Sequence, residues 1–336
     1  MTTEHLLDPE LRPLLQQMPA FHFTRENLDK FRRAGAAVAT LGDAAVAGVQ
    51  RESITISGAD LDVPCLLYTP KARKTEAADL HIHGGGDVGG QMERSDPMNT
   101  LIASQLGITV LAVGYRLAPE HPVPAPLDEC YAALAWLHDQ AKPLGIDRDR
   151  IAIGGESAGG GLAAALAIRA RDAGDYAVCH QHLTYPMLDN LTGSESAPGD
   201  PLVGEFVWTR KSNEFGWSCY LGDHPAQAPH VPARVASVEG LPPTWMFTVG
   251  LDLFRDENIE YAQRLLAAGV PTELVVLPGA CHAFQVLPGT SLGKRYVADH
   301  LLALGRALGG QAGGKQHSIH QAARRPRSAT GSYRTD

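Results

Sequence analysis

The stretch RIAIGGESAGGGLAAALA at residues 150–167 decides the fold class of this chain. It opens with a short apolar run typical of a buried strand and closes with an alanine- and leucine-rich run typical of a helix. Between them lies the G-x-S-x-G element of residues 155–159, whose glycines permit a sharp strand-to-helix turn. The pattern predicts that the Ser157 hydroxyl stands exposed at a helix N-terminus, where backbone N–H groups favour negative charge. Ser157 is therefore a candidate nucleophile, although a bare G-x-S-x-G also occurs in ordinary glycine-rich turns.

Alternation of strands and helices extends this pattern along the chain and predicts an α/β fold with a mostly parallel, eight-stranded sheet. Residues 51–57 and 61–68 are expected to form an antiparallel hairpin around residues 58–60. Six more strands are expected at residues 78–83, 108–115, 150–154, 179–185, 244–250 and 273–277, and helices at about 96–106, 126–141, 158–172, 256–268 and 293–308. Residues 1–48 and the aromatic-rich excursion 187–230 do not fit the alternation, and such an excursion often caps a site, although its aromatics are also typical of a core.

Composition excludes several classes of protein. The net charge of −8 becomes −12 without the basic residues 309–336, which argues against nucleic-acid binding by the body of the chain. Residues 309–336 lack apolar periodicity and are predicted to be a disordered tail. Five cysteines without a C-x-x-C pair fit reduced thiols. Without a signal-peptide pattern or a long apolar run, we expect a cytoplasmic protein that does not bind a membrane.

A serine nucleophile needs a base, and the base needs an acid that orients it. On a sheet of this kind the acid and the histidine follow the serine in that order, each after a later strand. Asp252 follows the strand predicted at 244–250, and His282 follows the strand predicted at 273–277. Asp256 and Glu257 compete with Asp252, but their positions favour capping of the next helix.

Acyl transfer also needs N–H groups that receive the negative charge on the substrate oxygen. His83-Gly84-Gly85-Gly86 follows an apolar strand, and Ala158 follows the candidate nucleophile, so their amides are candidates. Gly84-x-Gly86-x-x-Gly89 also matches a dinucleotide-binding pattern, but the next strand ends at residues 114–116 without the acid that the ribose requires. The histidine pairs 81/83 and 180/182 lack a third metal ligand nearby and are interpreted as core or site-lining residues.

Six ordered blocks resemble the hormone-sensitive-lipase-like (bacterial family IV) esterases of the α/β-hydrolase superfamily. They are HGGG at 83–86, YRLAPEHP at 115–122, GESAGG at 155–160, YPMLD at 185–189, GLDLFRDE at 250–257 and HAF at 282–284. The resemblance covers about residues 50–308. It implies an α/β-hydrolase fold over residues 49–186 and 231–308, with a helical cap built from residues 1–48 and 187–230.

The resemblance also implies roles for single residues. Ser157 would be the nucleophile, His282 the general base and then acid, and Asp252 its orienting carboxylate. Gly85, Gly86 and Ala158 would supply the oxyanion hole, supported by His83, Gly84 and Glu156. Pro119 and Pro124 would follow cis peptide bonds. No cofactor or metal is implied.

Three positions depart from the family pattern: Asp87 after the glycines, Glu156 in place of aspartate, and Ala283 in place of glycine. Asp87, Trp208 and Phe215 are candidates for the substrate pocket. Asp87 would put a carboxylate near the substrate entrance. The sequence therefore does not indicate which acyl or alcohol group the protein prefers.

The resemblance and motifs together predict a serine carboxylesterase that hydrolyses short- to medium-chain, water-soluble esters. A non-catalytic ligand receptor on the same fold is an alternative, although the presence of His282 argues against it. Amide, lactone or carbamate hydrolysis is another alternative, because a triad alone does not select the bond. Homodimerisation is possible by analogy with the family.

Overall fold

The computed structural model describes residues 2–17, 22–39, 48–57, 62–287 and 289–309. The turn predicted at residues 58–60 and nearly all of the predicted tail lie outside these residues. Gly309, which we assigned to the tail, is instead the last residue of a helix.

An eight-stranded sheet with the order β1-β2-β4-β3-β5-β6-β7-β8 forms the centre of the molecule. β1 pairs with β2 and β2 with β4 in antiparallel fashion, whereas all the other pairs are parallel. The strands are β1 (Val49–Ser57), β2 (Asp62–Pro70), β3 (Ala78–Ile82), β4 (Thr109–Val113), β5 (Ile151–Glu156), β6 (His180–Thr184), β7 (Thr244–Val249) and β8 (Thr272–Leu277). The predicted fold class and all eight predicted strands are therefore confirmed.

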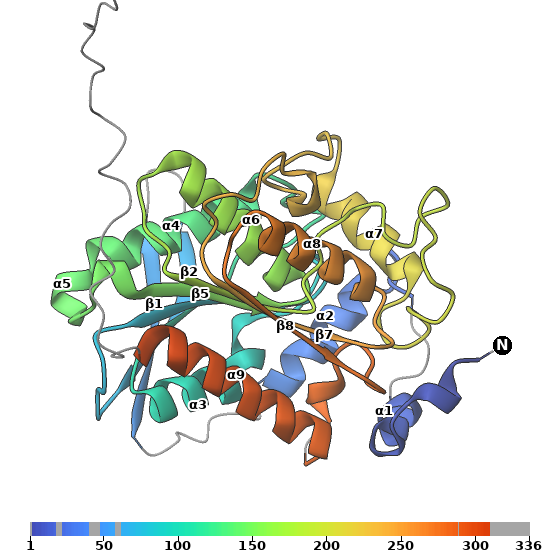
Figure 1. The fold of residues 1–336 in the computed structure, drawn as a ribbon, viewed down its shortest axis with the longest axis horizontal. Helices are drawn as coiled ribbons and strands as arrows, with labels where there is room; N and C mark the ends of the chain where they lie inside the picture. The colour runs from blue at the N-terminus through green and yellow to red at the C-terminus, as the bar shows by residue number, and fades with distance from the viewer. Residues whose placement is uncertain (1, 18–21, 40–47, 58–61, 288, 310–336) are drawn as a thin grey trace, which may run out of the picture.

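Helices cover both faces of this sheet (Figure 1). On one face lie α3 (Asp96–Leu106) and α9 (Ser291–Gly309), and on the other lie α4 (Ala125–Asp139), α6 (Ala158–Ala173) and α8 (Arg255–Ala267). The remaining helices are α1 (Arg12–Gln17), α2 (Leu28–Ala39), α5 (Ala141–Leu144) and α7 (Arg210–Leu221). The pattern at 126–141 thus forms two helices, α4 and α5, and α5 ends at Gly145, which has a left-handed φ of 62°.

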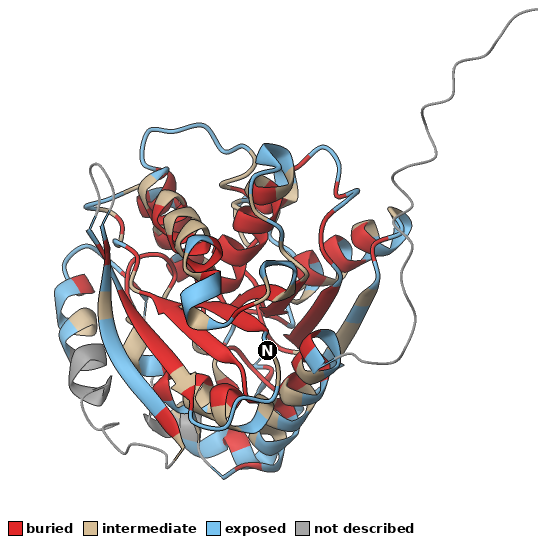
Figure 2. Cartoon of the chain, turned by 90° about the vertical axis from the view of Figure 1, so that its left-hand side faces the viewer, coloured by how far each residue is buried: buried red, intermediate tan, exposed pale blue. Residues whose placement is uncertain are grey.

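The central strands are buried along their whole length, because both of their faces are covered (Figure 2). This burial explains why β4 and β7 read as nearly continuous apolar runs, whereas β3 also carries the buried Asp79 and His81. The carboxyl ends of β5, β7 and β8 lie at one edge of the sheet, where a parallel α/β fold places its site. None of the helices in the described ranges is long and apolar enough to cross a membrane.

The N-terminal segments and the excursion after β6 pack on this edge. α2 reaches the glycine-rich loop through Arg32, whose guanidinium donates to the carbonyl oxygens of Val88 and Ala118 at 2.7 Å each. His22 Nδ1 lies 2.9 Å from the hydroxyl of Thr209, the residue that caps α7. The two segments that did not fit the strand–helix alternation therefore meet each other above the sheet.

Candidate active site

The turn between β5 and α6 holds Ser157 in a strained conformation, with φ 58° and ψ −123°. Its flanking glycines allow the turn to pack directly on β3. A Cβ at Gly155 or Gly159 would lie 2.2 or 2.1 Å from the carbonyl oxygen of Ile82, closer than real Cβ atoms approach. The Ser157 N–H donates to the Thr184 carbonyl at 2.9 Å, which ties the turn to β6 as well.

Ser157, His282 and Asp252 come together as a hydrogen-bonded chain. His282 Nε2 lies 2.9 Å from Ser157 Oγ, and His282 Nδ1 lies 2.7 Å from Asp252 Oδ2. The second carboxylate oxygen of Asp252 accepts from the Phe254 N–H at 3.1 Å. This geometry lets Nδ1–H donate to the carboxylate while Nε2 accepts the serine proton, as an activated nucleophile requires.

Aromatic rings enclose the imidazole of His282. The ring centroids of Tyr185, Phe254 and Trp208 lie 4.6, 5.5 and 6.1 Å from that of His282. The prediction that Ser157 stands exposed is wrong for this conformation, because only 6% of its surface is accessible. Trp208, from the excursion after β6, packs against Gly86 and His282 beside this serine.

The loop after β3 presents amides beside this serine. Gly85 and Gly86 have φ values of 141° and 64°, which favour glycine. Within the described ranges, the amides of Gly85 and Gly86 donate to no protein acceptor, which leaves them open to a substrate oxygen. Gly84 lies against the elbow, since a Cβ on it would be 2.7 Å from the carbonyl oxygen of Glu156.

His83 stabilises this loop through contacts with Tyr115 and Gly84. Its ring stacks on Tyr115 with centroids 4.3 Å apart, and Tyr115 Oη donates to the His83 carbonyl at 2.9 Å. His83 Nδ1 lies 3.0 Å from the carbonyl oxygen of Gly84. Burial lowers the pKa of His83 to about 4, so the ring is neutral at physiological pH.

Glu156 anchors the strand just before the nucleophile. Its carboxylate accepts from Ser95 Oγ at 3.0 Å and lies 3.1 Å from His81 Nε2. Burial alone would raise the pKa of Glu156, but the His81 charge and these hydrogen bonds lower it to about 2. Glu156 therefore stays ionised and links the elbow to β3 and to the residues before α3.

His182, from the second histidine pair, belongs to a buried hydrogen-bonded chain that reaches α9. His182 Nε2 lies 2.8 Å from Asp79 Oδ1, and its Nδ1 lies 2.9 Å from His300 Nε2. Burial lowers the pKa of His300 well below its usual value, so this ring is neutral. Across the described part of the chain, no group of three or more His, Cys, Asp or Glu side chains is arranged to hold a metal ion. These histidines hydrogen-bond within the core.

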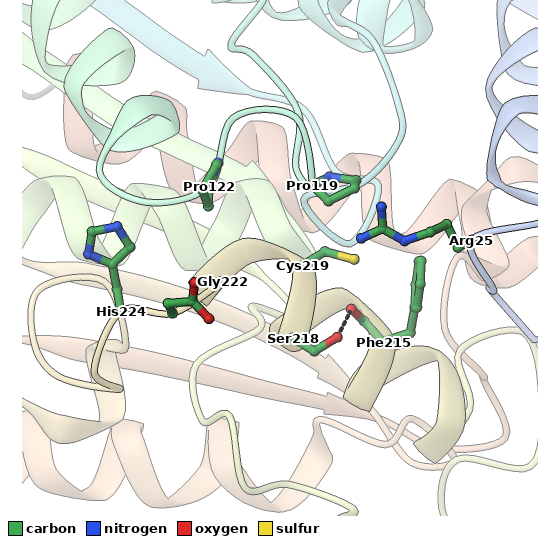
Figure 3. A pocket seen from close by; sticks show the side chains of 9 residues that line it. Arg25, Pro119, Pro122, Phe215, Ser218, Cys219, Gly222 and His224 are labelled. Atoms are coloured by element: carbon green, nitrogen blue, oxygen red, sulfur yellow. Dashed lines mark hydrogen bonds between the residues drawn. The ribbon is translucent and has the colours of Figure 1, made fainter.

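The three candidates for the substrate pocket lie in different places. Trp208 lies at the site, since a Cβ on Gly86 would be 2.1 Å from its ring. Asp87 follows the oxyanion loop directly and is 3% exposed. Phe215 lines a separate surface pocket with Arg25, Pro119 and Pro122, and none of the candidate triad residues lines it (Figure 3).

Sequence reasoning did not select Tyr185, Phe254 or Tyr220 as site residues. Tyr185 and Phe254 lie within the YPMLD and GLDLFRDE blocks, so membership of these motifs was the signal that could have indicated them. Tyr220 lies on α7 one turn beyond Gly216, which approaches the glycine loop. Both prolines expected to follow cis bonds, Pro119 and Pro124, do so.

Comparison with known proteins supports this arrangement. Residues 80–286 match the alpha/beta hydrolase fold family. The chain is 31% identical to an arylesterase of Saccharolobus solfataricus over 294 residues, which are 85% of this chain and 94% of that protein. It is 37% identical to Esterase LipI of Mycobacterium tuberculosis over 204 residues, 58% of this chain, and that match spans 61% of LipI.

The solved structure titled bacterial heroin esterase has the same fold. It superposes with a TM-score of 0.84 at 39% identity and covers 91% of this chain and 99% of its own. Residues 80–286, which match the family, contain the elbow, the glycine-rich loop and both loops that carry Asp252 and His282. The chain therefore belongs to the alpha/beta hydrolase fold family and, within it, to the hormone-sensitive-lipase-like esterases.

Proposed function

We propose that the protein is a serine carboxylesterase in which Ser157, His282 and Asp252 form the catalytic triad. The observation that carries the proposal is the continuous hydrogen-bonded chain from Ser157 Oγ through the imidazole to a carboxylate that is 1% exposed. Relatives named esterase, arylesterase and carboxylesterase support the same reaction class.

In the acylation step, Ser157 Oγ attacks the ester carbonyl carbon while His282 Nε2 takes the hydroxyl proton. The carbonyl oxygen gains negative charge and accepts from the Gly85, Gly86 and Ala158 amides. Collapse of the tetrahedral intermediate breaks the bond to the alcohol oxygen, which receives the proton from Nε2–H. Asp252 stabilises the transient imidazolium and fixes its tautomer.

In the deacylation step, water takes the place of the alcohol. The oxygen of the water attacks the acyl carbon while His282 Nε2 removes a proton from the water. His282 then transfers this proton to Ser157 Oγ as the carboxylic acid leaves. The same amides receive the charge. The N-terminus of α6, which begins at Ala158, adds its dipole to this stabilisation.

We expect short- to medium-chain, water-soluble esters to be the preferred substrates. The large apolar side chains exposed in the described ranges are scattered over the surface, and only Leu191 and Leu202 belong to the excursion after β6. Such a surface lacks the wide apolar patch with which an interfacial lipase meets a lipid droplet.

The test measures initial rates on p-nitrophenyl acetate, butyrate, octanoate and palmitate with wild type, Ser157→Ala and the control Ser104→Ala. Ser104 is the matched control because its hydroxyl bonds only to Leu101 O, within α3. We expect Ser157→Ala to lose about 10⁴-fold or more in kcat while staying folded, because the triad acts as a unit. A folded wild type that is inert toward every ester, or a fully active Ser157→Ala, contradicts the proposal. Faster cleavage of triglyceride emulsions than of butyrate esters contradicts the substrate class.

A further inference from the structure

Asp87 is a buried carboxyl group without a partner. It follows Gly86 directly, has a φ of 61°, and its carbonyl oxygen accepts from the Ala118 N–H at 2.9 Å, which fixes its backbone. Its side chain is 3% exposed, and Oδ1 is fully buried without a hydrogen bond. No ion pair joins Asp87 to any residue in the described ranges.

The hydroxyl of Tyr220 is a second polar group without a partner in the same region. On α7, Gly216 approaches the glycine loop, since a Cβ there would lie 3.0 Å from Gly86 O. Tyr220 lies four residues later and therefore on the same face of the helix, one turn farther along. Both residues also bond to the same loop, since the Val123 N–H donates to the Tyr220 carbonyl at 2.8 Å and the Ala118 N–H donates to that of Asp87.

Electrostatics supports the same placement. Burial raises the pKa of Tyr220 well above its usual value, and the Asp87 charge raises it further. Burial is also the one cause that raises the pKa of Asp87 to about 7, so no positive charge or hydrogen bond of the described chain offsets the desolvation. Tyr220 Oη is buried and makes no hydrogen bond in the described structure.

Buried polar groups in native proteins nearly always have partners, and an exception beside a catalytic loop indicates a ligand that supplies one. The carboxylate of Asp87 lacks a donor and the phenol of Tyr220 lacks any partner. A ligand with N–H groups could donate to both oxygens. A carboxylate in an apolar, water-poor site binds a cationic donor more strongly than a neutral one.

We propose that Asp87 and Tyr220 form a subsite that recognises an ammonium group on the ester substrate. The inference rests on the proposed esterase function and narrows its substrate class to esters that carry a protonated amine. The carboxylate of Asp87 accepts from the N–H of the amine, and the phenol oxygen of Tyr220 accepts from a second N–H where the amine has one. Both residues determine specificity and take no part in the chemical steps.

The test uses two pairs of esters that differ only by nitrogen in place of a CH group. On the alcohol side the pair is 2-(dimethylamino)ethyl butyrate and 3-methylbutyl butyrate. On the acyl side it is ethyl 4-(dimethylamino)butyrate and ethyl 5-methylhexanoate. Values of kcat/KM are measured at about pH 8, above the pKa of Asp87. The enzymes are wild type, Asp87→Asn, Tyr220→Phe and the control Asp223→Asn, which removes an exposed carboxylate from the same cap.

We expect wild type to prefer the amine in at least one pair by about tenfold or more, as for a hydrogen bond to a charged group. Asp87→Asn should bring that ratio close to one, whereas Asp223→Asn should preserve it. A wild-type ratio of one or less in both pairs overturns the inference, and so does a ratio that Asp87→Asn leaves unchanged. Failure of wild type to hydrolyse even the neutral esters would instead count against the proposed function.

An independent measurement covers the case in which Asp87→Asn does not fold. With wild type and Tyr220→Phe, 2-aminoethanol, whose ammonium group has three N–H bonds, and propan-1-ol are compared as inhibitors of p-nitrophenyl butyrate hydrolysis. Tighter inhibition of wild type by the amino alcohol, weakened in Tyr220→Phe, supports the subsite. Equal inhibition by the two alcohols, together with equal rates on both ester pairs, refutes it.

Discussion

At the scale of single residues, Asp87 combines two unfavourable features, a left-handed backbone conformation and a buried carboxylate without a partner. Each of them destabilises the folded state. Residues with such features are kept where they serve a site, because function and stability often conflict there. The position of Asp87, directly after Gly85 and Gly86 of the proposed oxyanion hole, fits this explanation.

Replacement of Asp87 by asparagine should therefore stabilise the protein in a pH-dependent way. The folded pKa of Asp87 is about 7, above the ordinary value of 3.8, so the folded state binds more protons than the unfolded state between these values. Wild type thus loses stability as pH rises through this window, and Asp87→Asn does not. Asp87→Asn and wild type should have nearly equal free energies of unfolding at about pH 4. Above about pH 7 the variant should be more stable than wild type by a few kcal/mol.

Urea unfolding of both proteins across this pH range measures that difference. Asp223→Asn is the control, because an exposed carboxylate should give a difference that is small at every pH. Equal stabilisation by Asp87→Asn at the two ends of the range would show that Asp87 is not a buried, unpaired acid.

At the scale of elements, the packing of the elbow on β3 sets the distance between Ser157 and the glycine-rich loop. β5 pairs with β3 so that Ile82 lies opposite Gly155, and α6 then starts across the end of β3. His83 and the oxyanion glycines follow Ile82 directly. Any group that pushes the elbow away from β3 therefore also moves Ser157 away from the amides of Gly85 and Gly86.

Gly159→Ala should reduce both stability and kcat. The added Cβ would lie 2.1 Å from Ile82 O and 2.5 Å from His83 O, and both contacts are with backbone that has no room to rotate away. Alanine favours a helix over glycine by about 1 kcal/mol, which is less than the 1–3 kcal/mol of overpacking a core. We expect a net loss of stability and a loss in kcat of tenfold or more.

Thermal unfolding and kcat on p-nitrophenyl butyrate provide the two readouts. Gly305→Ala in α9 is the matched control, since its added Cβ meets only the flexible Leu106 side chain at 3.2 Å. That variant should be neutral or slightly stabilised and fully active. A Gly159→Ala protein as stable and as active as this control would mean that the close packing is not required.

At the scale of the whole molecule, the sequence predicts the strands and motifs, which are local features. It does not predict contacts between side chains that lie far apart in the chain. The strands were predictable because apolar runs and turn residues lie within ten residues of each other. That Ser157, Asp252 and His282 meet was predictable because the order of the motifs places each after its own strand. The chain Asp79–His182–His300 was not predictable, because His182 and His300 are 118 residues apart. They meet only through the order of the strands and the packing of α9 on the sheet. Phe215 was placed in the substrate pocket on aromatic character alone, which does not tell which side of α7 it occupies.

The N-terminal segment also makes contacts that no local pattern predicts. The N–H of Asp8 donates to the carbonyl of Gly279 at 2.9 Å, in the loop that carries His282. Glu205 accepts at 2.6 Å from the N–H of Thr3, so the same segment holds the excursion after β6. The first residues thus link the histidine loop to the cap.

Leu11 tests whether this segment helps to place the triad. It is fully buried in one apolar cluster with Cys281 and Phe284, the neighbours of His282. Leu11→Ala should lower the free energy of unfolding by about 2–5 kcal/mol through the cavity it leaves. Because the cavity lies under the histidine loop, we expect kcat to fall more than KM changes. Leu266→Ala, at a leucine that is 54% exposed, should leave stability and both constants nearly unchanged. If Leu11→Ala lowers the unfolding temperature but keeps the wild-type kcat below that temperature, the segment stabilises the fold without positioning His282.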